Sequence, residues 1–439
     1  MVEKNLKAAF HTLGCKLNFS ETSAIGKVLY ERGVTRAARG DSPDIIVVNT
    51  CSVTETADKK GRQLIRRLAA RYPEATMVVT GCYAQLKPEE VAALEGVDIV
   101  LGSNEKLKAA EYIDKWLDSR SKQIDVTPFR EIEGFIPSCE RGDRTRYFLK
   151  VQDGCDYFCT YCTIPFARGK SRSGTISQLT EMARAAADEG GKEIVITGVN
   201  IGDFGKNTGE TFFDLIKSLD KVEGIERYRI SSIEPNLLTE EIIRWVARES
   251  RAFMPHFHIP LQAGSDLVLK KMNRHYDTSL FESRITMIKD MIPDAFIGVD
   301  VIAGARGETR EEWEKGIAFI ESLPITRLHV FPYSERPGTA ALLLGDSVPP
   351  SERHRRVNTL TAISDRKFEA FYNEHIGSEA EVLWEHPVRG GEEMHGFTRN
   401  YIRVTAPCRP ELINTLSRVR LTGHDTSDPD SLRAQIIQS

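Results

Sequence analysis

The chain has 439 residues, of which 41% are hydrophobic and 28% charged, and its formal net charge is −4. These values are typical of a globular protein of several domains, and they exclude a polycationic nucleic-acid binder. The first thirteen residues are mixed and charged, and no apolar run approaches the ~18 residues of a membrane span. We therefore expect a cytoplasmic protein without membrane contact, whose eight cysteines stay reduced and serve metal chemistry.

Residues 1–127 alternate short apolar runs with helix-like sequence. The runs cover residues 8–14, 44–50, 76–81 and 98–101. Strand–helix alternation at this spacing predicts a doubly wound parallel sheet, whose strands all end at one edge. The first three runs lead into Cys15, Cys51 and Cys82. The sheet would bring these thiols together where open α/β sheets bind ligands, and three inert buried cysteines are the alternative.

Residues 140–375 contain six further strand–helix units. The expected strands cover residues 147–151, 193–197, 227–231, 256–261, 296–301 and 326–331. Six such units predict a complete or open (β/α)6 barrel, resembling part of a TIM barrel, with its active site at the carboxyl ends of the strands. Polar or glycine-containing segments follow several strands, at residues 198–203, 232–235, 262–265 and 303–308. Together around one mouth they predict a small-molecule pocket.

Three cysteines follow the first barrel strand within eight residues: Cys155, Cys159 and Cys162. Thiolates this close select zinc or an iron–sulfur cluster. Structural zinc usually takes four ligands in two close pairs, whereas the nearest other cysteine upstream, Cys139, is sixteen residues away. The spacing therefore favours an iron–sulfur cluster with one iron left open, at the barrel mouth.

Residues 376–439 have the sequence of a small all-β module. The expected strands cover residues 379–385, 394–406, 417–423 and 432–437, and a helix at 351–375 would link them to the barrel. The module resembles the TRAM domain, an OB-like β-barrel associated with RNA binding. Because it holds seven Lys/Arg against nine Asp/Glu, an RNA-binding face would have to be local. The candidates for that face are Arg389, Phe397, Arg399, Tyr401 and Arg403, although for Phe397 we expect a packing role instead.

The three-cysteine motif after a first barrel strand resembles the radical S-adenosylmethionine superfamily. The strand-end cysteines upstream narrow the resemblance to the methylthiotransferases, and it then covers nearly the whole chain. This resemblance implies three domains, at residues 1–127, 140–375 and 376–439. It also implies two 4Fe–4S clusters and S-adenosyl-L-methionine as cofactors. The cluster that binds S-adenosylmethionine would be held by Cys155, Cys159 and Cys162, and the auxiliary cluster that delivers sulfur by Cys15, Cys51 and Cys82.

Short motifs resemble one branch of that family. Gly14-Cys15-Lys16-Leu17-Asn18 and the segment 169–173 resemble the branch that acts on N6-threonylcarbamoyladenosine at position 37, beside the tRNA anticodon. The isopentenyladenosine branch tends to read Gly-Cys-Gln-Met-Asn, and the ribosomal-protein branch Gly-Cys-Pro-Lys-Asn. The resemblance implies methylthiolation of C2 of a base flipped into the barrel mouth. The alternatives are isopentenyladenosine in tRNA, a ribosomal-protein aspartate, and a non-catalytic, zinc-stabilised RNA-binding protein.

The resemblance further implies a cofactor pocket and partners. The pocket residues would be Tyr161, Asn200, Ser231, Glu234, Gln262, Arg274, Asp300 and Phe331. The partners would be a tRNA anticodon stem-loop, an electron donor such as flavodoxin or ferredoxin, and a sulfur donor. Two positions depart from the family pattern: Phe204 replaces a frequent tyrosine, and Ala305-Arg306 replaces a common Phe-Pro. Cys139 and Cys408 are isolated, and we expect no role for them.

Overall fold

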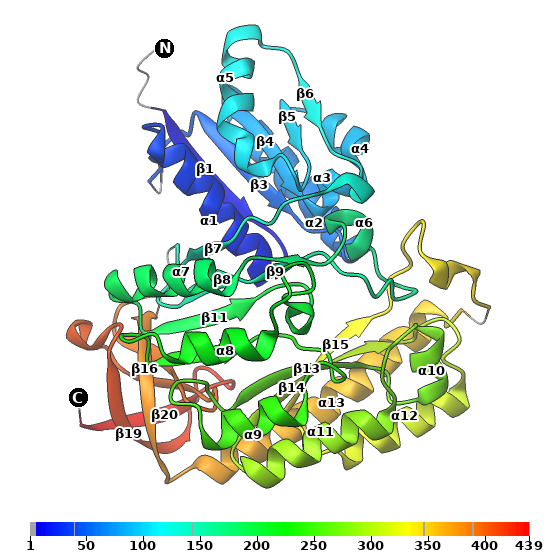
Figure 1. Ribbon diagram of the computed structural model, residues 1–439, viewed down its shortest axis with the longest axis vertical. Helices are drawn as coiled ribbons and strands as arrows, with labels where there is room; N and C mark the ends of the chain where they lie inside the picture. The colour runs from blue at the N-terminus through cyan, green and yellow to red at the C-terminus, as the bar shows by residue number, and fades with distance from the viewer. Residues whose placement is uncertain (1–5, 39, 143, 346, 389, 439) are drawn as a thin grey trace.

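The computed structural model describes residues 6–38, 40–142, 144–345, 347–388 and 390–438. Three parts follow one another along the chain: a parallel sheet covered by helices, an open barrel of strands and helices, and a small closed β-barrel (Figure 1). These parts confirm the predicted fold class. Within the described ranges, no helix is long and apolar enough to cross a membrane.

The N-terminal sheet contains six parallel strands in the order β2–β1–β3–β4–β5–β6. These strands are β1 (Lys7–Thr12), β2 (Thr35–Arg36), β3 (Ile45–Thr50), β4 (Thr76–Gly81), β5 (Ile99–Leu101) and β6 (Gln123–Asp125). The helices α1 (Lys16–Glu31) and α5 (Ala109–Ser119) cover one face, and α2 (Glu55–Arg71), α3 (Cys82–Leu86) and α4 (Pro88–Ala92) the other. The sequence did not predict β2 and β6, because these short edge strands lack an apolar run.

The open barrel is built from two sheets. Its strands are β7 (Ser138–Glu140), β8 (Tyr147–Lys150), β11 (Glu193–Thr197), β12 (Arg227–Ile230), β13 (His256–Gln262), β14 (Phe296–Ala303) and β15 (Arg327–Pro332). One sheet has the order β12–β11–β8–β7 and the other β13–β14–β15, and single bridges such as Tyr228–Phe253 join them. All strands except β7 run parallel, so the six expected strands are present and end at one mouth. Cys139 lies on the antiparallel edge strand β7.

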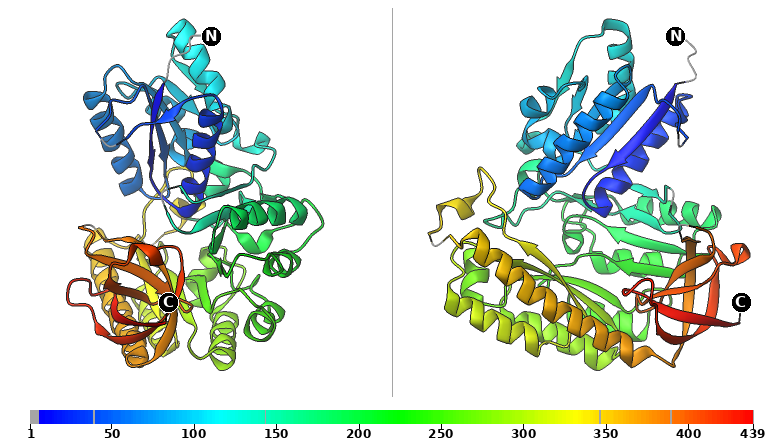
Figure 2. Two further views of the ribbon diagram at one scale, coloured as in Figure 1. Left: turned by 90° about the vertical axis from the view of Figure 1, so that its left-hand side faces the viewer. Right: turned by 180° about the vertical axis from the view of Figure 1, so that it is seen from behind.

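Helices cover the outside of this barrel and connect its strands. They are α7 (Ile176–Asp188), α8 (Phe212–Asp220), α9 (Glu240–Arg248), α10 (Asp266–Lys271), α11 (Thr278–Met291) and α12 (Arg310–Ser322). The short helix α6 (Ile164–Arg168) instead lies against α3 of the N-terminal part. The long helix α13 (Pro350–His375) packs along β15 and leads to the C-terminal barrel (Figure 2). N-terminal caps such as Thr175, Thr211 and Thr239 accept a hydrogen bond from the first turn of α7, α8 and α9.

The C-terminal barrel closes in the order β16–β17–β18–β20–β19. Its strands are β16 (Glu379–Pro387), β17 (Glu393–Thr398), β18 (Arg403–Pro407), β19 (Leu416–His424) and β20 (Leu432–Gln438). The prediction of one strand over residues 394–406 is wrong, because the chain reverses between β17 and β18. Tyr401 has a φ of 67° in that turn, a left-handed conformation that the local sequence did not reveal.

The two aromatic candidates for the RNA-binding face lie between the C-terminal barrel and the open barrel. The rings of Phe397 and Tyr401 stack with centroids 4.7 Å apart, and the Tyr401 ring lies 4.3 Å from that of His256. Arg146 lies over the Phe397 ring. Packing at the start of the open-barrel strands thus uses both rings, as expected for Phe397, and the prediction of an RNA-binding role is wrong for Tyr401. Arg389 lies outside the described residues.

Candidate active site

The structure brings three thiols together at the carboxyl edge of the N-terminal sheet: Cys15, shortly after β1, and Cys51 and Cys82, directly after β3 and β4. Burial, followed by the charge of Cys82, raises the pKa of the Cys51 thiol to about 12. Burial also raises the pKa of Cys82, which Cys15 raises further. Gly14 has a φ of +99°, and a Cβ there would lie 3.0 Å from the Cys51 sulfur, so glycine allows the two loops to touch.

The second group of thiols, Cys155, Cys159 and Cys162, lies in the loop between β9 (Gln152–Asp153) and α6, at the mouth of the open barrel. Burial raises the pKa of Cys155 and of Cys162 to about 12, and in each case the charge of Cys159 adds to the effect. The Cys162 amide donates to the Cys159 carbonyl (2.9 Å), which holds the loop in a tight turn. A cationic centre would reverse this mutual repulsion by stabilising the thiolates.

The arrangement of both groups differs from that of a single-ion site. In the part of the chain that the structure describes, no three His, Cys, Asp or Glu side chains are placed to hold one metal ion. In an iron–sulfur cluster each thiolate binds a different iron, so the sulfur atoms need not all lie within bonding distance of one metal ion. Three gathered thiols at each group are a ligand set that an iron–sulfur cluster can use.

A cavity of about 190 Å³ lies beside Cys162. Four of the predicted cofactor residues line it: Tyr161, Gln262, Asp300 and Phe331. Gln262 has a φ of 68° at a β-bulge of β13, and the bulge turns its side chain toward the cavity. Val53 and Thr54, from the loop between β3 and α2 of the N-terminal part, also line it. Sequence reasoning missed these two residues, because nothing local links them to the barrel.

The other four predicted residues lie around the same mouth. Glu234 and Arg274 form an ion pair, and the Arg274 guanidinium also donates to the sulfur of Cys159 (3.2 Å). Burial raises the pKa of Glu234, and Arg274 opposes that rise. Asn200 and Ser231 are buried, and their side-chain polar atoms have no hydrogen-bond partner among the described residues. Buried polar atoms without partners call for a polar ligand, and the amino acid and ribose groups of S-adenosylmethionine fit this need.

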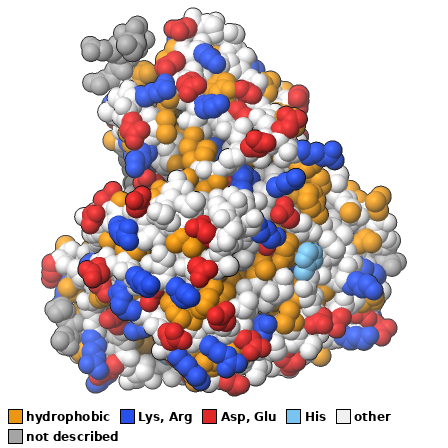
Figure 3. Space-filling view, in the orientation of Figure 1, with side chains coloured by type: hydrophobic (Ala, Val, Ile, Leu, Met, Phe, Trp, Pro, Cys, Tyr) orange, Lys and Arg blue, Asp and Glu red, His pale blue; other side chains and the backbone are white. Residues whose placement is uncertain are grey.

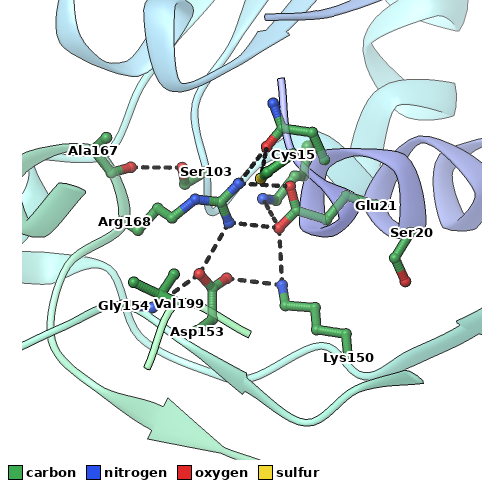
Figure 4. A network of polar contacts seen from close by, with 12 residues as sticks. Cys15, Ser20, Glu21, Ser103, Lys150, Asp153, Gly154, Ala167, Arg168 and Val199 are labelled. Atoms are coloured by element: carbon green, nitrogen blue, oxygen red, sulfur yellow. Dashed lines mark hydrogen bonds and ion pairs between the residues drawn. The ribbon is translucent and has the colours of Figure 1, made fainter. Parts of the chain in front are cut away.

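Two buried arginines that follow the cysteine loop in sequence, Arg168 (Figure 4) and Arg336, bind the helices and loops around the N-terminal sheet. Arg168 donates to Asn18 (2.6 Å), and also to Glu21 and Asp153 (2.9 Å each). Arg336 donates to Asp58 and Ser52, each at 2.8 Å. These contacts hold the two cysteine groups toward each other. Sequence reasoning missed both arginines, because their partners Asn18, Ser52 and Asp58 lie at least 150 residues away in the chain.

The open barrel, the cysteine loop at its mouth and the cofactor cavity define a radical S-adenosylmethionine enzyme with a second three-cysteine site. Comparison with known families agrees with this class. Residues 149–320 match the radical SAM superfamily, and residues 7–102 match a family described as "Uncharacterized protein family UPF0004".

Full-length relatives define the family more narrowly. The chain is 39% identical to the threonylcarbamoyladenosine tRNA methylthiotransferase MtaB of Bacillus subtilis, over 94% of this chain and 93% of the relative. It is 30% identical to the tRNA-2-methylthio-N(6)-dimethylallyladenosine synthase of Protochlamydia amoebophila, over 97% and 96%. The chain belongs to the radical S-adenosylmethionine methylthiotransferase family.

A solved structure supports the fold. The radical S-adenosylmethionine methyltransferase TsrM of Kitasatospora setae superposes with a TM-score of 0.57 over 77% of each chain, at 13% sequence identity. At this identity the likeness concerns the fold alone.

Proposed function

We propose that this protein transfers a methylthio group to C2 of N6-threonylcarbamoyladenosine at position 37 of tRNA. The observation that carries the proposal is the contact between the two cysteine-bearing loops. Thr163, the residue after Cys162, donates through its hydroxyl to the carbonyl of Ser52, the residue after Cys51, at 3.5 Å. A site that makes a radical thus adjoins a site that can hold sulfur. The relatives named for threonylcarbamoyladenosine support the choice of base.

We further propose two 4Fe–4S clusters, one on each cysteine group. When bound, these clusters and S-adenosylmethionine supply two things: a radical that attacks an unactivated C–H bond, and the sulfur that replaces the hydrogen. The chain's own residues prepare the site for these groups. The six thiols would lose their protons on binding iron, Arg274 offers a cation beside Cys159, and Tyr161 and Phe331 line the cavity.

The proposed partners follow from the same chemistry. A base in an anticodon loop must leave its stack to reach the barrel mouth, so we propose a tRNA anticodon stem-loop as substrate. An electron donor such as flavodoxin or ferredoxin, and a sulfur donor, would complete the cycle in the cytoplasm. Figure 3 shows acidic and basic side chains interspersed on one face, so tRNA contacts there would use small local groups of cations. We propose that residues 1–127, 140–375 and 376–439 act as the sulfur, radical and RNA domains.

The test is a reconstitution with defined tRNA. The enzyme, loaded with iron and sulfide, is incubated with tRNA that carries N6-threonylcarbamoyladenosine, and the nucleosides are analysed by mass spectrometry. We expect the 2-methylthio product. A matched variant, Cys15→Ala/Cys51→Ala/Cys82→Ala, should still form 5′-deoxyadenosine but no methylthio product. A product only on isopentenyladenosine or on a ribosomal-protein aspartate would overturn the proposed substrate.

A further inference from the structure

Arg168 physically connects the two cysteine groups. It is the last residue of α6, and α6 begins two residues after Cys162. Its side chain is 2% exposed and crosses from the open barrel into the N-terminal sheet. The carbonyl of Ala167 accepts a hydrogen bond from Ser103 Oγ (2.8 Å), which fixes the end of α6 against the same sheet. A displacement of the Cys162 loop would therefore move Arg168.

Asn18 links Arg168 to the sulfur-bearing side. Its Oδ1 accepts from Arg168 Nη2 (2.6 Å) and lies 3.7 Å from the Cys15 sulfur. Its Nδ2 donates to the carbonyls of Leu13 (2.9 Å) and Thr50 (3.0 Å). Leu13 lies two residues before Cys15, and Thr50 directly precedes Cys51. One amide thus fastens two of the three cysteine loops, and the guanidinium of Arg168 fixes the orientation of that amide.

The surroundings of Arg168 carry a surplus of positive charge. Lys106, Lys150 and Arg168 all bind Glu21, and the last two also bind Asp153 (Figure 4). Each of these side chains is at most 5% exposed. Three cations thus face two carboxylates in a region of low dielectric beside Cys15 and Cys82, and Arg172 binds Asp153 as a fourth cation (3.3 Å).

From these contacts we propose that Arg168 is a positioning residue, which orients the Cys15 and Cys51 loops through Asn18 and places a fixed cation beside the second cluster. This inference rests on the proposed two-cluster function. Arg168 touches neither the base nor S-adenosylmethionine in this role. It sets where the sulfur-bearing site stands relative to the radical-forming loop, and it favours the reduced, more negative state of the second cluster.

The first test isolates the second cluster. In a Cys155→Ala/Cys159→Ala/Cys162→Ala background, only Cys15, Cys51 and Cys82 can hold iron. The reduction potential and the electron paramagnetic resonance spectrum of that cluster are measured with Arg168, Arg168→Lys and Arg168→Gln. We expect similar iron content, a more negative potential for Arg168→Gln, and a smaller shift with an altered spectrum for Arg168→Lys. Unchanged potentials and spectra in both variants would overturn the proposal.

The second test uses the full enzyme and compares two products. In Arg168→Lys, a single ammonium cannot bind Asn18 and Asp153 in the same geometry as the guanidinium. We expect 5′-deoxyadenosine formation within about twofold of the parent, but about tenfold less methylthio product per 5′-deoxyadenosine. Arg172→Lys is the matched control, because Arg172 also binds Asp153 (3.3 Å) but not Asn18. It should keep the parental ratio.

The outcomes separate this inference from the proposed function. If Arg168→Lys keeps the parental product ratio, or lowers both products in parallel with the melting temperature, the positioning role is wrong. If Arg168→Gln fails to fold, Arg168→Lys alone decides, since it keeps the charge and loses the guanidinium geometry, and an unchanged spectrum in that variant overturns the proposal. If the parent enzyme makes no methylthio nucleoside on any tRNA, the proposed function fails, and the potential of the isolated second cluster still decides the role of Arg168.

Discussion

Arg336→Met should strongly destabilise the junction between the open barrel and the N-terminal sheet. The guanidinium is 2% exposed and donates to Asp58, which is fully buried, and to Ser52. Removing one partner of a buried ion pair costs about 3–5 kcal/mol, because the other charge stays buried without compensation. Asp58 keeps Ser52 (2.6 Å) and Lys87 (3.4 Å), so we expect a loss of about 3 kcal/mol, at the low end of that range.

Urea denaturation under anaerobic conditions measures this change. Arg310→Met is the control, because Arg310 makes a comparable 2.8 Å ion pair with Glu314 but is 89% exposed, and its stability should match the parent. Asp58→Asn removes the buried charge that Arg336→Met leaves without its partner. The double variant Arg336→Met/Asp58→Asn should therefore lose less free energy of unfolding than the two single variants lose in sum. A loss below about 1 kcal/mol for Arg336→Met, or simple additivity in the double variant, would refute the reasoning.

Three further predictions concern the cysteine loop, the cofactor cavity and the buried ion network. Gly154 has a φ of +71°, and Gly154→Ala places a Cβ 2.0 Å from the carbonyl oxygen of Lys170. We expect the variant to be destabilised by more than about 2 kcal/mol and to bind less iron at the Cys155 loop, which iron analysis checks. Gln262→Gly and Gln262→Ala should both weaken S-adenosylmethionine binding in a calorimetric titration. The glycine variant should be more stable than the alanine variant by about 1 kcal/mol, because glycine adopts the left-handed φ of 68° without strain. Burial would raise the pKa of Glu21 and Asp153, but the cations around them, Arg168 and Lys150 foremost, outweigh burial and hold both pKa values below the usual range. Their stabilisation is therefore complete above about pH 5 and is lost as acid protonates the unfolded chain first. We expect the melting temperature of the parent to be flat from pH 6 to 8 and to fall below about pH 4, and a fall that already begins near pH 6 in the parent would contradict this prediction.

The residues that could be predicted from the sequence are those whose signals are local. Apolar runs that end in Cys15, Cys51 and Cys82 predicted parallel strands, and the rule that such strands end at one edge predicted that the thiols gather. The turn at Tyr401 could not be predicted, because it contains no glycine or proline at its left-handed position. Tyr401 was misassigned for a related reason: an aromatic side chain suits a nucleic-acid surface and a packed interface equally well in sequence.

The sequence by itself determined the elements, the two three-cysteine groups and the chemistry that thiolates allow, because helical and strand periodicity and ligand spacing are encoded within a few residues. Only the tertiary structure decided how the two groups face each other. That arrangement depends on Arg168 reaching Asn18 across 150 residues, and on Arg336 reaching Asp58 across 278. A buried charge finds its partner through the fold rather than through the neighbouring sequence, because the cost of burial is offset only where the packed elements bring the opposite charge within hydrogen-bonding distance.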